Sequence, residues 1–187
     1  SKQLKGKTIL ITGAAGSIGS EIVRQVLTFE PYKVIILDQA ETPLHHIGLE
    51  VEMIKKGVII HSVIADIRDR TAVERVFKMY KPDMVYHAAA YKHVPLMEGN
   101  PSQAILTNVN GTKNLADLSC EYGVKKLVMI STDKAVNPSN VMGASKRIAE
   151  KYVQSLHLKC QLDNGLYATK FITTRFGNVL GSNGSVV

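Results

Sequence analysis

A regular alternation of short apolar bursts and longer amphipathic stretches constrains this chain more than any other feature. Continuous apolar bursts are typical of strands buried on both faces, and they occupy residues 8–12, 33–37, 58–65, 84–87, 126–130 and 167–175. Apolar residues at helical spacing occupy residues 17–29, 42–56, 69–80, 101–122 and 139–158. Strands and helices that alternate in this way form parallel βαβ units, so the sequence predicts an α/β fold with a doubly wound parallel sheet.

Composition and charge narrow the class of partner. The 187 residues are 45% hydrophobic, which is enough to build the core of one domain. Basic residues exceed acidic ones by 23 to 16, and the resulting net charge of +7 would suit a nucleic acid, an anionic membrane or a phosphorylated ligand. Because the lysines are scattered and only 6% of residues are aromatic, we expect no nucleic-acid partner.

Hydropathy and cysteine spacing bear on location and redox state. No apolar run approaches the ~20 residues that span a bilayer, and charges stand near the N-terminus where a signal peptide has its apolar core. We therefore expect a cytoplasmic chain with no membrane contact of its own. Cys120 and Cys160 lie far apart without a metal-binding or disulfide spacing, so we expect both to be reduced packing residues, and we expect no metal site.

A glycine-rich turn joins the first predicted strand to the first predicted helix. Its spacing is G-x-x-G-x-x-G, which permits a tight turn and lets the backbone approach a pyrophosphate at the N-terminus of the helix. The Gly-Lys-Ser/Thr of a nucleoside-triphosphate loop is absent from the turn, which argues against an ATPase. The sequence therefore predicts a Rossmann-like dinucleotide-binding domain. The residues expected at the pyrophosphate are Gly13, Ala15, Gly16, Ser17, Ile18 and Gly19.

Acidic residues at the ends of the next two strands bear on the choice of cofactor. Asp38 stands 19 residues after Gly19, where a carboxylate accepts hydrogen bonds from the adenosine ribose, and Gln39 follows it. No arginine stands nearby to hold a 2′-phosphate, so NAD is favoured over NADP. The alternative for Asp38 is that it binds no cofactor and only caps a turn. Asp66 and Ile67 are candidates for holding the adenine, although an aspartate at a strand end is also ordinary turn chemistry.

Small residues after the fourth predicted strand are further candidates for cofactor contacts. Ala88, Ala89 and Ala90 would let the cofactor lie against the backbone, or would form a tight packing site. Asn108 lies within a long helical pattern, where it is either a surface residue or a member of a proton relay.

The stretch from Ser131 to Lys146 raises the question of where the proton chemistry lies. A lysine four residues after a tyrosine is the catalytic pair of many nicotinamide enzymes, but here Met142 holds the tyrosine position. Met142 and Lys146 lie on one helical face, and Lys146 is expected to bind the nicotinamide ribose. A methionine side chain cannot take part in proton transfer. Either another group takes over the proton transfer that the tyrosine would perform, or the chain is an inactive homologue in which Met142 fills the core.

Six motifs together resemble those of one family: TGAAGSIG, HAAAYKHVP, NVNGT, ISTDKAVNP, MGASK and RFGNVLGS. The chain is similar to the nucleotide-sugar 4,6-dehydratases of the extended short-chain dehydrogenase/reductases. Within them it resembles the catalytic part of membrane-associated enzymes of capsular polysaccharide synthesis and protein glycosylation that act on UDP-N-acetylglucosamine. The resemblance covers nearly the whole chain.

This resemblance implies a reaction and roles for three residues. Such an enzyme transfers a hydride from sugar C4 to NAD, eliminates water across C5 and C6, and returns the hydride to C6. Asp133 matches the acid for the departing oxygen, and Lys134 matches the base for the C5 proton, which requires a neutral amine with a pKa lowered by burial. Thr132, Asp133 or a bound water would accept the C4 proton. We expect retention at C5.

The resemblance also implies contacts with a UDP-sugar and a longer whole protein. Lys92 and His93 match a loop that faces the sugar, and Asn178 matches a contact to the diphosphate or uridine. We expect residues 1–187 to be a truncated NAD-binding domain that lacks a C-terminal substrate part, and the whole protein to be a homo-oligomer. The alternatives are a UDP-sugar 4-epimerase, which needs only the C4 redox step, and a catalytically silent NAD-binding module.

Overall fold

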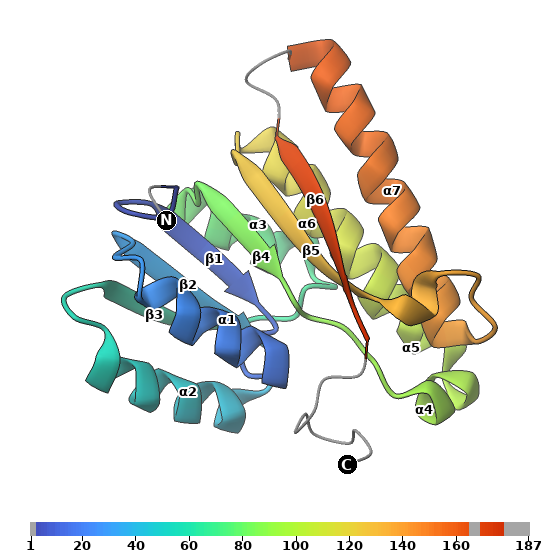
Figure 1. Ribbon diagram of the computed structural model, residues 1–187, viewed down its shortest axis with the longest axis horizontal. Helices are drawn as coiled ribbons and strands as arrows, with labels where there is room; N and C mark the ends of the chain where they lie inside the picture. The colour runs from blue at the N-terminus through green and yellow to red at the C-terminus, as the bar shows by residue number, and fades with distance from the viewer. Residues whose placement is uncertain (1–2, 165–168, 178–187) are drawn as a thin grey trace.

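One parallel sheet organises the computed structural model, which describes residues 3–164 and 169–177. Its six strands lie in the order β3-β2-β1-β4-β5-β6, so the doubly wound parallel sheet predicted from the sequence is confirmed (Figure 1). The strands are β1 (Thr8–Thr12), β2 (Lys33–Asp38), β3 (Ile59–Ile64), β4 (Met84–His87), β5 (Lys126–Thr132) and β6 (Lys170–Phe176).

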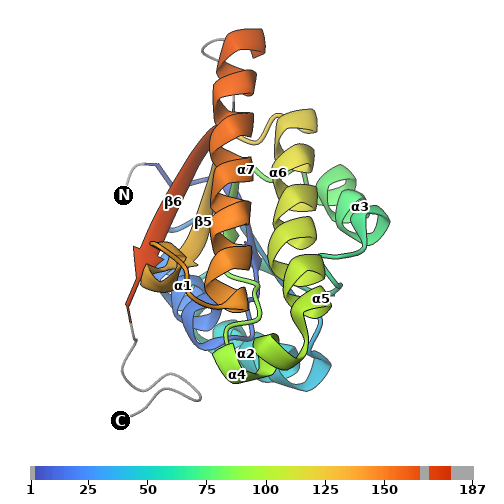
Figure 2. The ribbon, with the colours of Figure 1, turned by 90° about the vertical axis from the view of Figure 1, so that its right-hand side faces the viewer.

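Helices cover both faces of this sheet. Helices α1 (Ser17–Leu27) and α2 (Glu41–Ile54) pack on one face, and α3 (Arg70–Tyr80), α6 (Thr112–Glu121) and α7 (Val141–Asn164) pack on the other (Figures 1 and 2). In Figure 2, α6 and α7 run side by side along the second face. The chain reverses direction across the sheet after β3, so the ends of β1 and β4 diverge at the point where such folds bind ligands.

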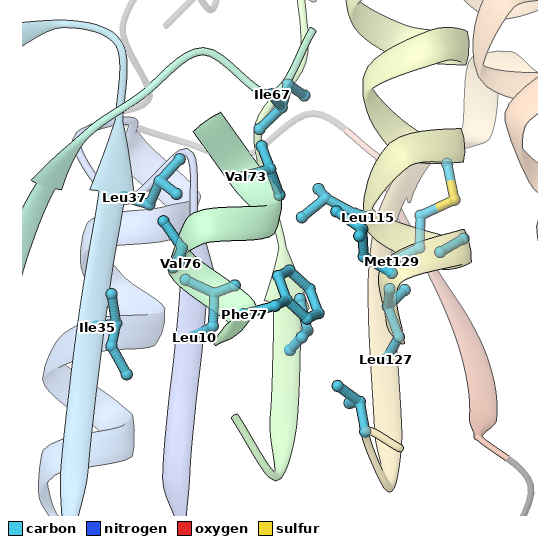
Figure 3. Packing of buried hydrophobic residues seen from close by; sticks show 14 of the residues in the cluster. Leu10, Ile35, Leu37, Ile67, Val73, Val76, Phe77, Leu115, Leu127 and Met129 are labelled. Atoms are coloured by element: carbon cyan, nitrogen blue, oxygen red, sulfur yellow. The ribbon is translucent and has the colours of Figure 1, made fainter. Parts of the chain in front are cut away.

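Alternate residues of the central strands supply the two halves of the core. Leu10 and Ile35 face α3 and α6, where Phe77 and Leu115 meet them, and all four are fully buried (Figure 3). Ile9, Ile11 and their neighbours on β2 face α1 and α2 instead. Burial of each such side chain contributes about 1.5–3 kcal/mol, so the sheet is a rigid base for the loops at its carboxyl edge.

Four local features differ from the expected elements. Helix α4 (Val94–Gly99) forms where no helix was predicted, with Pro95 in its first turn. The helix expected over residues 101–122 is continuous but mixed, because α5 (Pro101–Ala104) and α6 flank the π-helical segment η1 (Ile105–Gly111). Strand β5 runs on to Thr132, and the 3₁₀ turn η2 (Asp133–Ala135) follows it.

The prediction of two reduced cysteines is wrong. Cys120 at the end of α6 and Cys160 on α7 are joined as a disulfide, 40 residues apart in sequence. The two helices lie side by side and bring the two sulfur atoms together, which linear spacing does not reveal. None of the helices in the described ranges combines the length and the hydrophobicity needed to cross a membrane.

Candidate functional site

Two adjoining cavities open at the carboxyl ends of the strands. The larger has a volume of about 850 Å³ and the smaller about 260 Å³. They share part of their walls, and the shared residues are Gly13, Gly16, Ala88, Ala90 and Tyr91. Together they have the size of a pocket for a large organic ligand.

The glycine-rich turn forms part of the shared wall. Gly13 has φ +68°, and a Cβ there would lie 2.4 Å from the backbone nitrogen of Ala89, while a Cβ on Gly19 would lie 1.9 Å from the Gly13 carbonyl oxygen. Glycine is therefore required at both positions. A Cβ on Gly16 would meet no atom closer than 3.4 Å, and this glycine lines both cavities at the place where the sequence predicts a pyrophosphate. Ser17 and Ile18 line the larger cavity, and Ala15 lines the smaller one.

Asp38 fixes this turn from the end of β2. One carboxylate oxygen accepts the N–H of Ala15 at 3.0 Å, and the other accepts the N–H of Ala40 at 3.0 Å. Asp38 and Gln39 line the smaller cavity, so the remaining acceptor capacity of the carboxylate faces the place expected for a ribose. None of the described residues that line this cavity is a lysine or an arginine, and the walls therefore suit NAD, which lacks the 2′-phosphate of NADP.

The adenine end contains an ion pair that the sequence did not indicate. Asp66 and Ile67, the candidates for holding the adenine, line the smaller cavity. However, the Asp66 carboxylate already accepts hydrogen bonds from Arg68, from Nε at 2.7 Å and from the backbone N–H at 2.9 Å, and Arg68 reaches Gln103 at 2.9 Å. Burial raises the pKa of Asp66, but the bonds from Arg68 outweigh burial and lower it overall. A contact between Asp66 and adenine would share the carboxylate with Arg68.

A buried hydrogen-bond chain fixes the ends of β1 and β4 beneath the site. The Thr112 hydroxyl donates to the Asn108 carbonyl at 2.7 Å, so it accepts from His87 Nε2 at 2.9 Å. His87 Nδ1 therefore accepts from the Thr12 hydroxyl at 2.8 Å. Burial and, to a smaller extent, the charge of Lys146 lower the pKa of His87 to about 3, so the imidazole is neutral.

Asn108 is not the surface residue that one of the two alternatives expected. It is fully buried, so the surface alternative is wrong, and it is not among the residues that line either cavity. Its side-chain amide bonds the backbone N–H and carbonyl of Tyr91 at 2.8 and 3.0 Å and the Ser145 hydroxyl at 3.0 Å. Asn108 thus ties the loop after β4 to the helix that carries Lys146, and the π-helical segment is what presents it there.

The turn after β5 carries the predicted acid and base. The Thr132 hydroxyl donates to Asp133 at 3.0 Å, and Lys134 Nζ donates to the same oxygen at 3.4 Å. The bond from Thr132, with the charge of Lys134, holds the pKa of Asp133 below its usual value. Thr132 and Lys134 line the larger cavity, whereas Asp133 lies beside it. The side chains of Asp133 and Lys134 are 59% and 39% exposed, so the burial expected of Lys134 is not found.

The desolvated lysine of the site is instead Lys146. Its side chain is buried, and Nζ donates to the Ile130 carbonyl at 3.0 Å. Burial lowers the pKa of Lys146 to about 8, and the charge of Glu150 opposes this effect. Met142 lies one turn earlier and lines the same cavity, packed with Met97 and Ala104. The prediction that Met142 and Lys146 share a helical face is confirmed.

Three substrate contacts were predicted, and two of them can be placed. Lys92 and His93 line the larger cavity, while Asn178 lies outside the described residues. Ala89 lies on the wall of the smaller cavity. The sequence analysis missed several wall residues, because their aromatic, apolar or amide side chains give no specific signal in one sequence: Tyr91, Leu96, Met97, Asn100, Gln103 and Phe176.

The sheet order, the glycine turn at a helix N-terminus and the buried lysine behind it define a class, the Rossmann-like short-chain dehydrogenase/reductases. A family model described as polysaccharide biosynthesis protein matches residues 9–187, and the chain belongs to that family.

Individual relatives agree with this assignment. The capsular polysaccharide biosynthesis protein CapD of Staphylococcus aureus is 54% identical over the whole chain, which spans 30% of that protein. A UDP-N-acetylglucosamine 4,6-dehydratase (inverting) of Campylobacter jejuni is 40% identical over 97% of the chain, which spans 52% of that protein. The chain thus spans about half or less of these relatives.

Solved structures give the same result. The structure of Pen from Bacillus thuringiensis has a TM-score of 0.89 at 36% identity and matches 98% of this chain and 55% of that one. A Thermus thermophilus UDP-glucose 4-epimerase in complex with NAD has a TM-score of 0.74 at 30% identity and matches 90% of this chain and 54% of that one.

Proposed function

We propose that the whole protein is an NAD-dependent UDP-N-acetylglucosamine 4,6-dehydratase, a hydro-lyase that makes a UDP-4-keto-6-deoxy sugar for polysaccharide or glycoprotein glycan synthesis. One observation carries this proposal: the Thr132–Lys134 turn, Met142 and Lys146 meet at one cavity with the phosphate-binding turn. The 40% identity to a dehydratase of this specificity supports it.

The residues present fit NAD. In this proposal the backbone at Gly16 would hold the pyrophosphate at the start of α1, Asp38 would hold the adenosine ribose, and Lys146 would hold the nicotinamide ribose. The chemistry supplied by bound NAD is reversible hydride transfer at sugar C4 and C6. The polypeptide has to position the sugar and move the protons.

Asp133 can serve as base and then as acid. It is ionised at neutral pH, and the Thr132 hydroxyl bonded to it gives a path for the proton of the C4 hydroxyl, which Met142 cannot accept. The protonated Asp133 then gives that proton to the departing C6 hydroxyl, which leaves as water. Lys134 takes the C5 proton and returns it to C5, so the only atoms lost are those of one water. Both side chains are partly exposed, and substrate that covers them supplies the desolvation that proton transfer requires.

Incubating the whole enzyme with NAD and UDP-N-acetylglucosamine tests the proposal. A dehydratase accumulates a 4-ketosugar, detected by its absorbance, and Asp133→Asn with Lys134→Ala should abolish it while NAD still binds. Ketosugar formed at the wild-type rate by that double variant would refute the assigned roles. The product's configuration at C5 decides between the retention expected from the sequence and the inversion named for the Campylobacter jejuni relative.

A UDP-sugar 4-epimerase is the second candidate, because a UDP-glucose 4-epimerase of Rickettsia canadensis is 34% identical over 97% of the chain. An epimerase needs no acid and base for C5 and C6, and the Asp133–Lys134 pair argues against it. In the same assay an epimerase yields only the galactosamine isomer, and a silent NAD-binding module yields neither product.

Location, assembly and extent form the rest of the proposal. We propose that residues 1–187 are the NAD-binding domain of a cytoplasmic homo-oligomer that assembles through its long helices. We expect this segment to bind NAD but to turn over UDP-sugar poorly, because it spans 52% of the dehydratase relative. Full turnover by residues 1–187 alone would overturn that expectation.

A further inference from the structure

A buried charge cluster lies between α7 and β6, outside the roles assigned above. Glu150 is 0% exposed, and its two carboxylate oxygens accept hydrogen bonds from Arg175 at 2.8 and 2.7 Å. Arg147 donates a third at 3.2 Å. Burial, the largest single influence, raises the pKa of Glu150, but the hydrogen bonds from Arg175 and Arg147 and the charge of Arg175 act together with other contacts and hold it below its usual value. Glu150 is therefore a carboxylate inside the protein.

Two connections join Glu150 to the larger cavity. Along α7 it lies one helical turn after Lys146, whose ammonium its charge stabilises. On the neighbouring strand β6, Glu150 binds Arg175. The next two residues of the chain, Phe176 and Gly177, line the cavity wall. A Cβ on Gly177 would lie 3.8 Å from an Asp133 carboxylate oxygen, so this end of β6 borders the predicted acid and base.

Stability alone is a weak explanation for this cluster. Apolar side chains often replace a buried ion pair at no cost in stability, because removing two charges from water offsets most of their attraction. The charge environment of Lys146 gives a stronger reason. The titratable groups that face it are Glu150, on its own helix, and His87 on β4, which is neutral. The guanidinium groups of Arg147 and Arg175 are bound to Glu150.

We propose that Glu150 is a positioning residue of the active site: through its paired hydrogen bonds to Arg175 it holds the end of β6 beside Asp133, and its carboxylate, one turn after Lys146 on α7, offsets part of the positive charge around that lysine. This inference rests on the proposed function only for the identity of the cofactor. It concerns how the site is held, and the sugar reaction itself does not enter its test.

The first test compares Glu150→Gln with Glu121→Gln, which removes the same charge from an exposed pair with Arg70. The titration of Lys146 is followed by the ¹³Cε signal of labelled lysine, assigned with a Lys146→Met variant. In Glu150→Gln the midpoint should fall by about one pH unit, the lower end of the effect of an opposite charge at close range. NAD should then bind about fivefold more weakly at pH 8, where the ammonium is depleted, and almost normally at pH 6.

A purely structural role predicts a different result, namely weaker NAD binding by the same factor at both pH values. Glu150→Asp keeps the charge and should restore the midpoint. If Glu150→Gln folds and keeps both the wild-type midpoint of Lys146 and the wild-type NAD affinity at pH 8, the counter-charge role of Glu150 is overturned.

The second test addresses β6. Arg175→Lys keeps the charge but loses the paired hydrogen bonds, so amide hydrogen exchange at residues 175–177 should accelerate while the Lys146 midpoint stays in place. If amide exchange at residues 175–177 is unchanged in Arg175→Lys, the role of Glu150 in holding β6 is overturned. Arg175→Lys also decides the inference if Glu150→Gln does not fold. Both tests measure NAD binding, lysine titration or amide exchange without sugar. Their outcome therefore does not depend on the dehydratase assay, and the outcome of that assay does not depend on them.

Discussion

The buried Lys146 should make the stability of this protein depend on pH in a way that one substitution removes. Its side chain is 5% exposed and has a pKa of about 8 in the folded protein, against a reference value of 10.5. Because the folded pKa is lower, the unfolded chain binds the extra proton between these two pH values, and the free energy of unfolding rises as pH rises through that window.

The size of the effect follows from the two pKa values. Each pH unit within the window contributes about 1.4 kcal/mol, so the wild type should gain about 2.5 kcal/mol between pH 7 and pH 10 relative to a variant that cannot titrate there. Lys146→Met is the suitable variant, since methionine is unbranched and apolar and can occupy the same buried volume.

Urea unfolding of both proteins at pH 7, 8, 9 and 10 measures the gap directly. The gap should favour the variant most at pH 7 and narrow, or change sign, toward pH 10. Lys151→Met, which removes an exposed lysine from the same helix, is the control and should keep a constant gap to the wild type. A gap between wild type and Lys146→Met that is flat across this range would refute the assignment of Lys146 as the desolvated lysine.

Three further predictions concern the turn, the ribose and the cysteines. Gly19→Ala places a Cβ 1.9 Å from a backbone oxygen and should cost more than about 3 kcal/mol in urea unfolding, whereas Gly16→Ala should unfold almost like the wild type and lose NAD affinity in calorimetry. Asp38→Ala leaves two backbone N–H groups without their acceptor and should weaken NAD binding by about tenfold or more, and unchanged affinity would contradict its ribose role. Thiol titration of the denatured chain without reductant should find no free thiol at Cys120 or Cys160, and two titratable thiols would contradict the disulfide.

The elements that could be predicted are those marked in the sequence by the spacing of apolar residues or by glycines that the backbone requires. Strands buried on both faces read as unbroken apolar runs, and a glycine turn between a strand and a helix has few alternative structures, so the sheet and the glycine-rich turn follow from local sequence. Helix α4 was missed because Pro95 reads as a loop residue, although proline is favoured in a first helical turn. The π-helical segment was missed because its apolar spacing does not distinguish it from an α-helix.

The electrostatics of the site were not predictable, because they depend on which side chains the fold covers. Sequence motifs placed the tuned amine at Lys134, yet Lys134 lies on a short turn with an exposed face, whereas Lys146 lies under the end of β5. Asn108 shows the same limit. Its identity is compatible with a surface residue or a relay, and only the three-dimensional contact with Tyr91 and Ser145 reveals that it joins two parts of the wall.

Lys146 and Lys134 differ in what can remove them from water: the fold does so for Lys146, and a bound ligand would have to do so for Lys134. Lys146 is desolvated by the protein itself, so its charge is set before anything binds, and it suits a permanent cofactor contact. Lys134 and Asp133 remain 39% and 59% exposed, so in the proposed dehydratase reaction a bound sugar would have to supply the low-dielectric surroundings that proton transfer at C5 and C6 needs. In that proposed reaction the acid and base are exposed to bulk water until substrate covers the turn, so elimination would begin only with the sugar bound. The exposure of this pair, which argues against a preformed base, is therefore consistent with a dehydratase whose second step is activated by its own substrate.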